Sequence, residues 1–134
     1  MTATTTEPQA PALRLELSPD PRLLRVLRLV ASGVASLGEF DLAAVEEVRV
    51  AVDELGATLI SASDGAPIEL TFSLVDHTLC VEGSTALGSG ADLEVDPLTD
   101  RILDVVATSH EWSSAGGVAH GKFEKAANTA GAAA

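Results

Sequence analysis

The sequence predicts a single α/β domain in which helices cover one face of a mostly antiparallel sheet, forming a two-layer sandwich. Apolar residues alternate in four short segments and recur every three or four positions in three longer ones, patterns typical of strands and helices. Because every apolar strand face and helix stripe needs a covering layer, two packed layers satisfy both. A chain of 134 residues, 46% of them hydrophobic, is large enough for one such core, which we place at residues 12–125.

The first strand is expected at Ala12–Leu17, where leucines alternate with charged residues. Asp20 and Pro21 are typical of a helix start, because the aspartate accepts hydrogen bonds from free amides and proline needs no amide partner there. We expect this helix to run to about Leu37, with Gly38 as its C-terminal cap.

A second helix is expected to begin after Asp41, because aspartate commonly caps helix N-termini. Its apolar residues follow one stripe, which consists of Val45, Val48, Val52, Leu55 and Leu59. Arg49 follows Glu46 by three residues, a spacing that predicts a local ion pair.

A β-hairpin is expected next, because two alternating segments at residues 68–74 and 78–82 flank the polar pair Asp76 and His77. Residues 83–90 are rich in glycine, serine and alanine, which predicts a loop.

A third helix is expected from Pro97 toward His110, with Trp112 as a partly buried anchor after it. Its apolar side consists of Leu98, Ile102, Val105 and Val106. Gly116 and Gly117 break the chain before a last strand at residues 118–125.

The two ends of the chain are expected to form disordered tails. Residues 1–11 are small and polar, and residues 126–134 are almost entirely alanine, glycine and threonine. The start of the chain lacks the basic and apolar regions of a secretory signal, and no run of about 18 apolar residues is present to span a bilayer. We therefore expect a cytoplasmic protein.

The charge balance disfavours a nucleic-acid partner. Acidic residues number 20 against 8 basic ones, so the formal net charge is −12 and few cations are available to bind phosphates. The negative charge is concentrated in residues 41–112, whereas Arg22, Arg25 and Arg28 lie close together earlier. This asymmetry predicts two surfaces of different electrostatic character and suggests a basic partner for the acidic one.

Metal chemistry through cysteine and histidine is not expected. Cys80 is the only cysteine, which excludes an intramolecular disulfide and a cysteine-rich zinc site. His77, His110 and His120 lack the spacing of metal ligands.

The segment VAVDELGATLI at residues 50–60 lies in the second predicted helix, after the strand sequence LELS at residues 15–18 and a helix rich in arginine. In this order and spacing the chain resembles the anti-sigma factor and serine-protein kinase family of the GHKL (histidine kinase-like) ATPase superfamily. The resemblance covers most of the chain, and implies a GHKL (Bergerat-like) fold that binds ATP with Mg²⁺.

The family carries a Glu-x-x-x-Asn motif in the second helix, and Glu54 matches its first position. Residues four apart share a helix face, so the resemblance implies that the glutamate orients a nucleophile while the asparagine holds magnesium. The second position here is Thr58, whose hydroxyl is shorter than an asparagine side chain.

The family's glycine boxes are altered in this chain. In place of the first box, only Glu82 or the later Gly88 and Gly90 are available to contact a nucleotide. In place of the second, Asp96 or Asp100 lies close to the expected phosphate position, where like charges oppose binding. Asp96 is also a typical N-cap before Pro97, which is the interpretation we favour for it. Weak or lost ATP binding is therefore expected.

The resemblance also implies a partner-binding arginine in the first helix, for which Arg25 and Arg28 are the nearest equivalents. Our leading hypothesis is a regulator that binds a sigma factor, an anti-anti-sigma protein or both. One alternative is an active ATP-dependent serine-protein kinase that uses Glu54 and phosphorylates an anti-anti-sigma partner. A second is a non-catalytic homodimeric module that pairs through an edge strand at residues 68–74.

Overall fold

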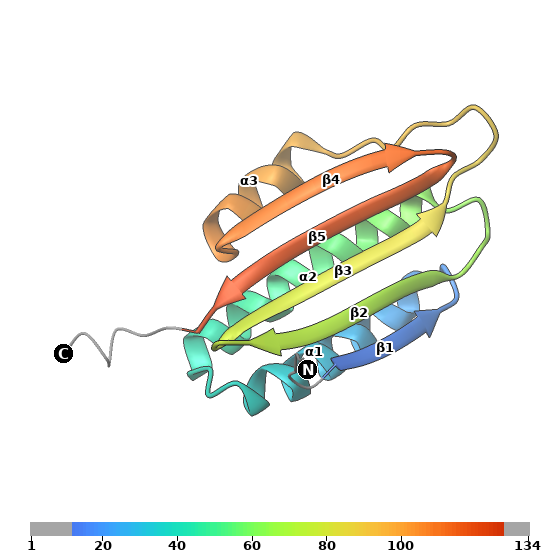
Figure 1. Ribbon diagram of the computed structural model, residues 1–134. Coiled ribbons are helices and arrows are strands. Elements are labelled where there is room, and N and C mark those ends of the chain that lie inside the picture. The colour runs from blue at the N-terminus through green and yellow to red at the C-terminus, as the bar shows by residue number, and fades with distance from the viewer. Residues whose placement is uncertain (1–11, 128–134) are drawn as a thin grey trace, which may run out of the picture.

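The computed structural model describes residues 12–127, which form a five-stranded antiparallel sheet and three α-helices (Figure 1). The elements in chain order are β1 (Ala12–Leu17), the 3-10 helix η1 (Pro21–Leu23), α1 (Leu24–Leu37), α2 (Leu42–Ala62), β2 (Ile68–Val75), β3 (Thr78–Ala86), α3 (Pro97–Val106), β4 (Ser109–Ala115) and β5 (Val118–Ala126). Residues 1–11 and 128–134, where we predicted disordered tails, lie outside the described part. Ala126, which we placed in the second tail, is the last residue of β5.

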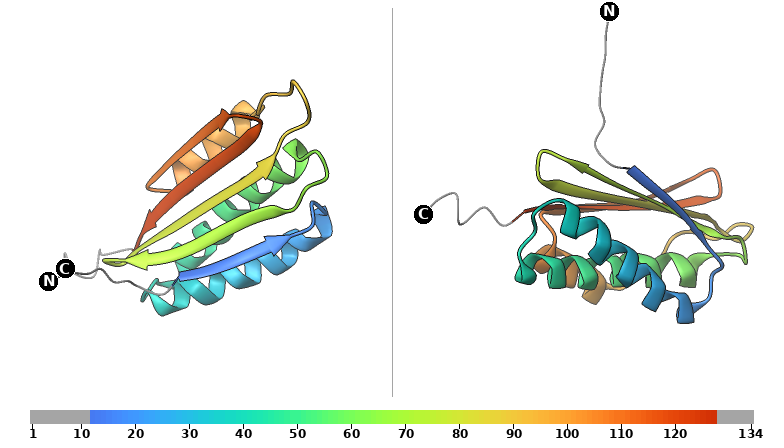
Figure 2. Two further views of the ribbon diagram at one scale, coloured as in Figure 1. Left: turned by 45° about the vertical axis from the view of Figure 1, so that its right-hand side comes forward. Right: turned by 90° about the horizontal axis from the view of Figure 1, so that it is seen from below.

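The sheet has the order β1-β2-β3-β5-β4, and all helices lie on one of its faces (Figure 2). The predicted α/β class, with helices beside an antiparallel sheet, is therefore confirmed. The core lies between the two layers and includes Phe72, Phe123, Leu55 and Leu59, each at most 1% exposed. Within residues 12–127 no helix is both long and apolar enough to cross a membrane.

The predicted helix starts are confirmed by their caps. Asp20 accepts a hydrogen bond from the Arg22 amide at 2.9 Å, although the first turn is η1 and precedes α1. Asp41 Oδ1 accepts from the Ala44 amide at 2.8 Å at the start of α2. Gly38 caps α1 with an ordinary negative φ of −98°, so a left-handed conformation is not its reason for being glycine. A Cβ there would approach Leu74 Cδ2 to 2.8 Å, which explains the missing side chain.

The β2–β3 hairpin forms at the predicted reversal, where Asp76 and His77 have φ values of 51° and 61°. The predicted loop at residues 83–90 is wrong in its first half, because β3 continues to Ala86. Gly83 does not break the strand. It is required by a close contact, since a Cβ there would lie 2.5 Å from Leu59 Cδ1 on α2.

The strand β4 was not predicted from the sequence. The third helix ends at Val106 and does not reach toward His110. Gly116 and Gly117 have φ values of 60° and 79°, so they form the turn of a β4–β5 hairpin where we expected only a chain break. Trp112 is partly buried as expected, but it lies within β4.

The second helix packs closely on the sheet at a pair of facing glycines. Gly83 of β3 and Gly121 of β5 are cross-strand neighbours, and Trp112 of β4 is opposite Gly121. A Cβ on Gly121 would lie 2.6 Å from both Leu55 Cδ1 and the Trp112 ring. The absence of side chains at this pair therefore lets α2 approach the centre of the sheet.

The apolar side predicted for α3 is buried only in part, because Ile102 and Val106 are half-buried and Val106 packs against the core. Leu98 and Val105 are 59% and 77% exposed, whereas the buried residues of this helix are Thr99 and Leu103. Polar contacts set the rotation of the helix, because Thr99 binds Glu54 and Asp100 binds residues of β4.

The strand at residues 68–74 is not an edge strand, which contradicts the predicted pairing surface of a homodimer. It belongs to β2, whose two neighbours β1 and β3 take up its hydrogen-bonding groups. The edges of the sheet are β1 and β4.

Candidate functional site

Glu54 and Thr58 lie one turn apart on α2, so helical periodicity places both on the same side of that helix. Glu54 is half-buried, and its Oε1 accepts a hydrogen bond from the Thr99 hydroxyl at 2.9 Å. The predicted catalytic carboxylate is thus hydrogen-bonded to a residue in the first turn of α3.

The N-terminus of α3 is capped by its own chain. Asp96 Oδ1 accepts from the Leu98 amide at 2.9 Å, and the Asp96 carbonyl accepts from the amides of Thr99 and Asp100. A negative side chain thus occupies the helix end whose free amides would otherwise attract an anion.

Glu82 lies on the other face of the sheet. Along β3 the residues on either side of it, Val81 and Gly83, are buried toward the helices, so Glu82 points away from them. It lines a shallow hollow on the open face and lies 3.9 Å from Lys122 Nζ. The structure therefore separates Glu82 from Glu54 by the thickness of the sheet.

The two remaining predicted nucleotide contacts, Gly88 and Gly90, lie in the loop between β3 and α3. The Ala91 amide donates to the Gly88 carbonyl at 2.9 Å, and Gly90 has a φ of 74°. Both glycines therefore belong to a tight turn. A Cβ would meet no atom within 4 Å at either position, but the positive φ of Gly90 favours glycine there.

The arginines of the first helix have different surroundings. Arg28 Nη1 lies 2.5 Å from Asp53 Oδ1, and this ion pair joins α1 to α2. Arg22 binds Asp20, which holds the pKa of that carboxyl below its usual value. Arg25 is exposed and has no ion pair within residues 12–127. Of the two predicted partner-binding arginines, only Arg25 is therefore free to bind another molecule.

The exposed side of α1 also carries three large apolar residues, Val26, Leu29 and Leu37. We call these residues, together with Arg25, the α1 surface. Leu29 and Leu37 are 67% and 66% exposed, and Val26 is 41% exposed. These positions are spaced three and eight apart, so they lie along one side of the helix. Sequence analysis did not single out these three residues.

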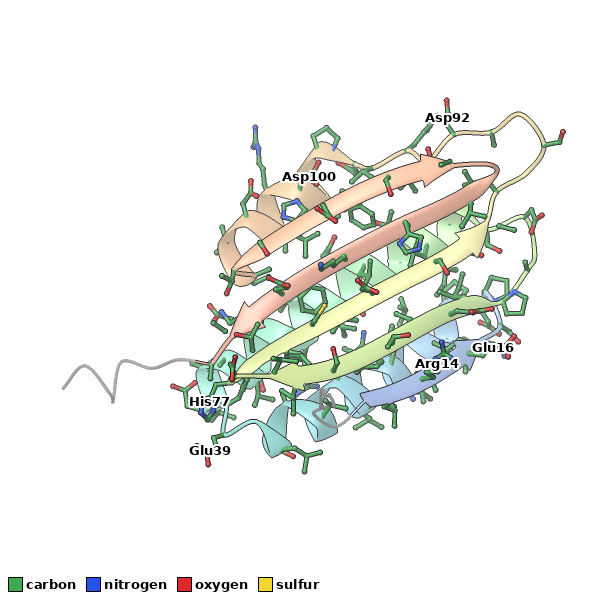
Figure 3. The ribbon with its side chains drawn as sticks, viewed as in Figure 1. Arg14, Glu16, Glu39, His77, Asp92 and Asp100 are labelled. Carbon is green, nitrogen blue, oxygen red and sulfur yellow. The ribbon has the colours of Figure 1, made fainter. Side chains whose placement is uncertain are left out.

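A polar cluster that was not predicted joins α3 to β4. Asp100 Oδ1 lies 2.9 Å from His110 Nε2 and accepts from Trp112 Nε1 at 3.0 Å. His110 Nδ1 lies 3.6 Å from Asp104 Oδ1. Figure 3 shows Asp100 on α3 beside β4. The cluster anchors one side of α3, and sequence analysis missed it because β4 was not recognised.

Comparisons with known proteins leave the family open. No protein-family model matches the chain, and no curated protein matches it. Within residues 12–127, no group of three or more histidine, cysteine or acidic side chains is arranged to hold a metal ion.

Proposed function

We propose that this chain is a protein-binding regulator of the anti-sigma type, built on a GHKL-like scaffold and acting without ATP chemistry. The observation that carries the proposal is the α1 surface, where Arg25 has no ion pair within residues 12–127 and lies one helical turn from the exposed Leu29. Exposed apolar side chains next to an arginine are typical of protein interfaces.

The order of elements supports the scaffold. A strand and a helix precede the helix with Glu54, and a hairpin follows, as in the GHKL-like family that the sequence resembles. The fold assignment remains part of this proposal, because an antiparallel sheet with three helices is a broader class than the GHKL fold.

The surroundings of Glu54 favour a protein-binding function over ATP-dependent catalysis. Its carboxylate accepts the Thr99 hydroxyl, and Asp96 caps the helix end where a phosphate would be expected. Glu82, a candidate for the adenine contact, points to the opposite face of the sheet. A triphosphate would meet negative charge without the expected contacts, so these side chains do not fit Mg²⁺-ATP.

The proposed partner of the α1 surface is an acidic amphipathic segment of a sigma factor or an anti-anti-sigma protein. Arg25 would pair with a carboxylate through its planar guanidinium, and Leu29 would be buried by apolar residues of the partner. Arg28 would act indirectly, because its ion pair with Asp53 fixes α1 on α2.

Two measurements test this function. A two-hybrid assay of the chain against the sigma factors and anti-anti-sigma proteins of its own genome should identify a partner, and Arg25→Glu or Leu29→Ser should abolish the signal. Arg14→Glu is the matched control, because Arg14 is an exposed arginine on β1. Calorimetry should detect no heat from Mg²⁺-ATP up to millimolar concentration. Magnesium-dependent binding in the micromolar range, lost in Glu54→Ala, would instead favour the kinase hypothesis.

A further inference from the structure

The strand β1 is an open edge of the sheet. It pairs with β2 on one side, and within residues 12–127 no strand pairs with its other side. The backbone groups on that side are therefore available to bind a further strand. On the helix side of this edge, Leu13 is 41% exposed and Leu15 is half-buried. A strand added here would cover apolar surface as well as satisfy the backbone.

The charged residues of β1 lie on the open face of the sheet. Arg14 and Glu16 alternate with the leucines, and Figure 3 shows both at this edge. Both are exposed, and neither has an ion pair within residues 12–127. Glu16 lies directly opposite Glu69 of β2, and like charges in that arrangement destabilise a strand pair. The edge thus carries one positive and one negative side chain that are both available to a neighbour.

The order of these residues makes the edge complementary to itself in an antiparallel pair. Residues directly opposite each other point to the same side of a sheet, so pairing an even with an odd position would set a charged residue against a leucine. Pairing Arg14 with Arg14, or Glu16 with Glu16, would place like charges together. The register between these two places Leu15 on a two-fold axis and sets Arg14 of each copy opposite Glu16 of the other. Charge therefore selects this register.

The helix layer is compatible with such a pair. At the β1 side of the layer, α1 lies beneath β1 and β2 (Figure 2), where it contacts α2 and β2. The ion pair of Arg28 with Asp53 marks the side of α1 that faces α2, and Val26 and Val30 lie on the opposite side. Val26 is 41% exposed and Val30 is half-buried. Paired strands lie about 4.8 Å apart, so two helices beneath the outer strands of each copy would lie about 10 Å apart, a helix packing distance.

We propose that two copies of this chain pair through β1 and form one continuous antiparallel sheet with two-fold symmetry. On the open face, Arg14 of each copy binds Glu16 of the other, which also offsets the repulsion between Glu16 and Glu69. On the helix side, the second copy covers Leu13 and Val26.

This inference does not depend on the proposed function. Of the α1 surface, the dimer covers Val26 but leaves Arg25 and Leu29 exposed, because these two lie on the side of α1 opposite to the buried Leu27. The failure of one proposal is therefore distinguishable from the failure of the other. Arg14→Glu should lose self-association and keep the two-hybrid signal of the partner, whereas Arg25→Glu should lose that signal and remain dimeric.

Sedimentation equilibrium of the full chain tests the proposal, and the wild type should approach twice the mass of one chain. Arg14→Glu and Glu16→Arg each place like charges across the two-fold axis, so each should weaken self-association by about tenfold or more. An equimolar mixture of these two variants should dimerise again, because a copy with two acids then faces a copy with two bases. Arg101→Glu is the matched control, because it makes the same change of charge at an exposed arginine on α3.

A wild type that stays monomeric up to millimolar concentration would overturn the proposal. A dimer that persists in both single variants, or a mixture no more dimeric than its components, would show that β1 does not pair in this register and would overturn it as well. The same holds for an equal loss in Arg101→Glu, which would assign the effect to net charge. Circular dichroism of each variant verifies that the fold is intact.

Discussion

Replacing Gly121 with alanine tests the packing that positions both α2 and β4. The new Cβ would lie 2.6 Å from Leu55 Cδ1 on α2 and 2.6 and 2.7 Å from two Trp112 ring carbons on β4. Carbon atoms pack best at about 3.5–4.0 Å, so each contact is about 1 Å too short. Because the two obstacles belong to different elements, relief requires movement of the α2 side chain, the tryptophan ring or the backbone between them.

The expected cost of Gly121→Ala is about 1–3 kcal/mol in the free energy of unfolding, the range for overpacking in a core. The assay is urea unfolding followed by fluorescence of Trp112, the only tryptophan of the chain, which lies directly at the altered contact. Gly33→Ala is the matched control. Gly33 lies on α1 with nothing within 4 Å of the added Cβ, so this change should stabilise the protein by about 0.5–1 kcal/mol.

A stability of Gly121→Ala within about 0.5 kcal/mol of the wild type would refute the close contact, since surface substitutions without such a feature usually stay in that range. If Gly33→Ala also destabilised the protein, the loss of stability in Gly121→Ala could not be assigned to the close contacts of Gly121. The change in Trp112 fluorescence of folded Gly121→Ala would further report whether the ring has moved.

Three further changes test local features. Asp41→Ala removes the N-cap of α2 and should lower the free energy of unfolding by about 1 kcal/mol in urea unfolding, with an unchanged value counting against the cap. Thr99→Val keeps the side-chain shape but removes the bond to Glu54, and should cost about 0.5–1.5 kcal/mol by the same assay; no loss would contradict that bond. Burial, followed by the charge of Glu82, raises the pKa of Cys80, so its alkylation by iodoacetamide at neutral pH should be slower than that of a free cysteine and rise only at higher pH. A rate equal to that of an exposed thiol would contradict this.

The sequence by itself determined the elements whose signals are local. Asp20, Asp41 and Asp96 cap helices because an aspartate side chain reaches amides only two or three residues further along the chain. The pair Asp76 and His77 was recognised as a turn because it directly joins two alternating segments. Glu54 and Thr58 share a side of α2 through helical periodicity alone.

The tertiary structure decided what depends on distant parts of the chain. The sequence around Gly83 predicted a loop, but the residue lies in β3 and its missing side chain lets Leu59 of α2 pack on it. The β4 strand carries only two half-buried residues on its helix side, His110 and Trp112, and both gain their role from Asp100 on α3. Neither contact leaves a periodic signal in the surrounding sequence.

The candidate site shows the same division. Sequence analysis placed Glu54 and Glu82 in one nucleotide site, but the pleat of β3 points Glu82 to the open face of the sheet. It also expected the apolar side of α3 to be buried, whereas the bonds of Thr99 and Asp100 rotate Leu98 outward. Short-range hydrogen bonding and periodicity determine where helices and strands begin and which residues share a side. Only packing between distant elements decides which of those sides is buried and which remains open to a partner.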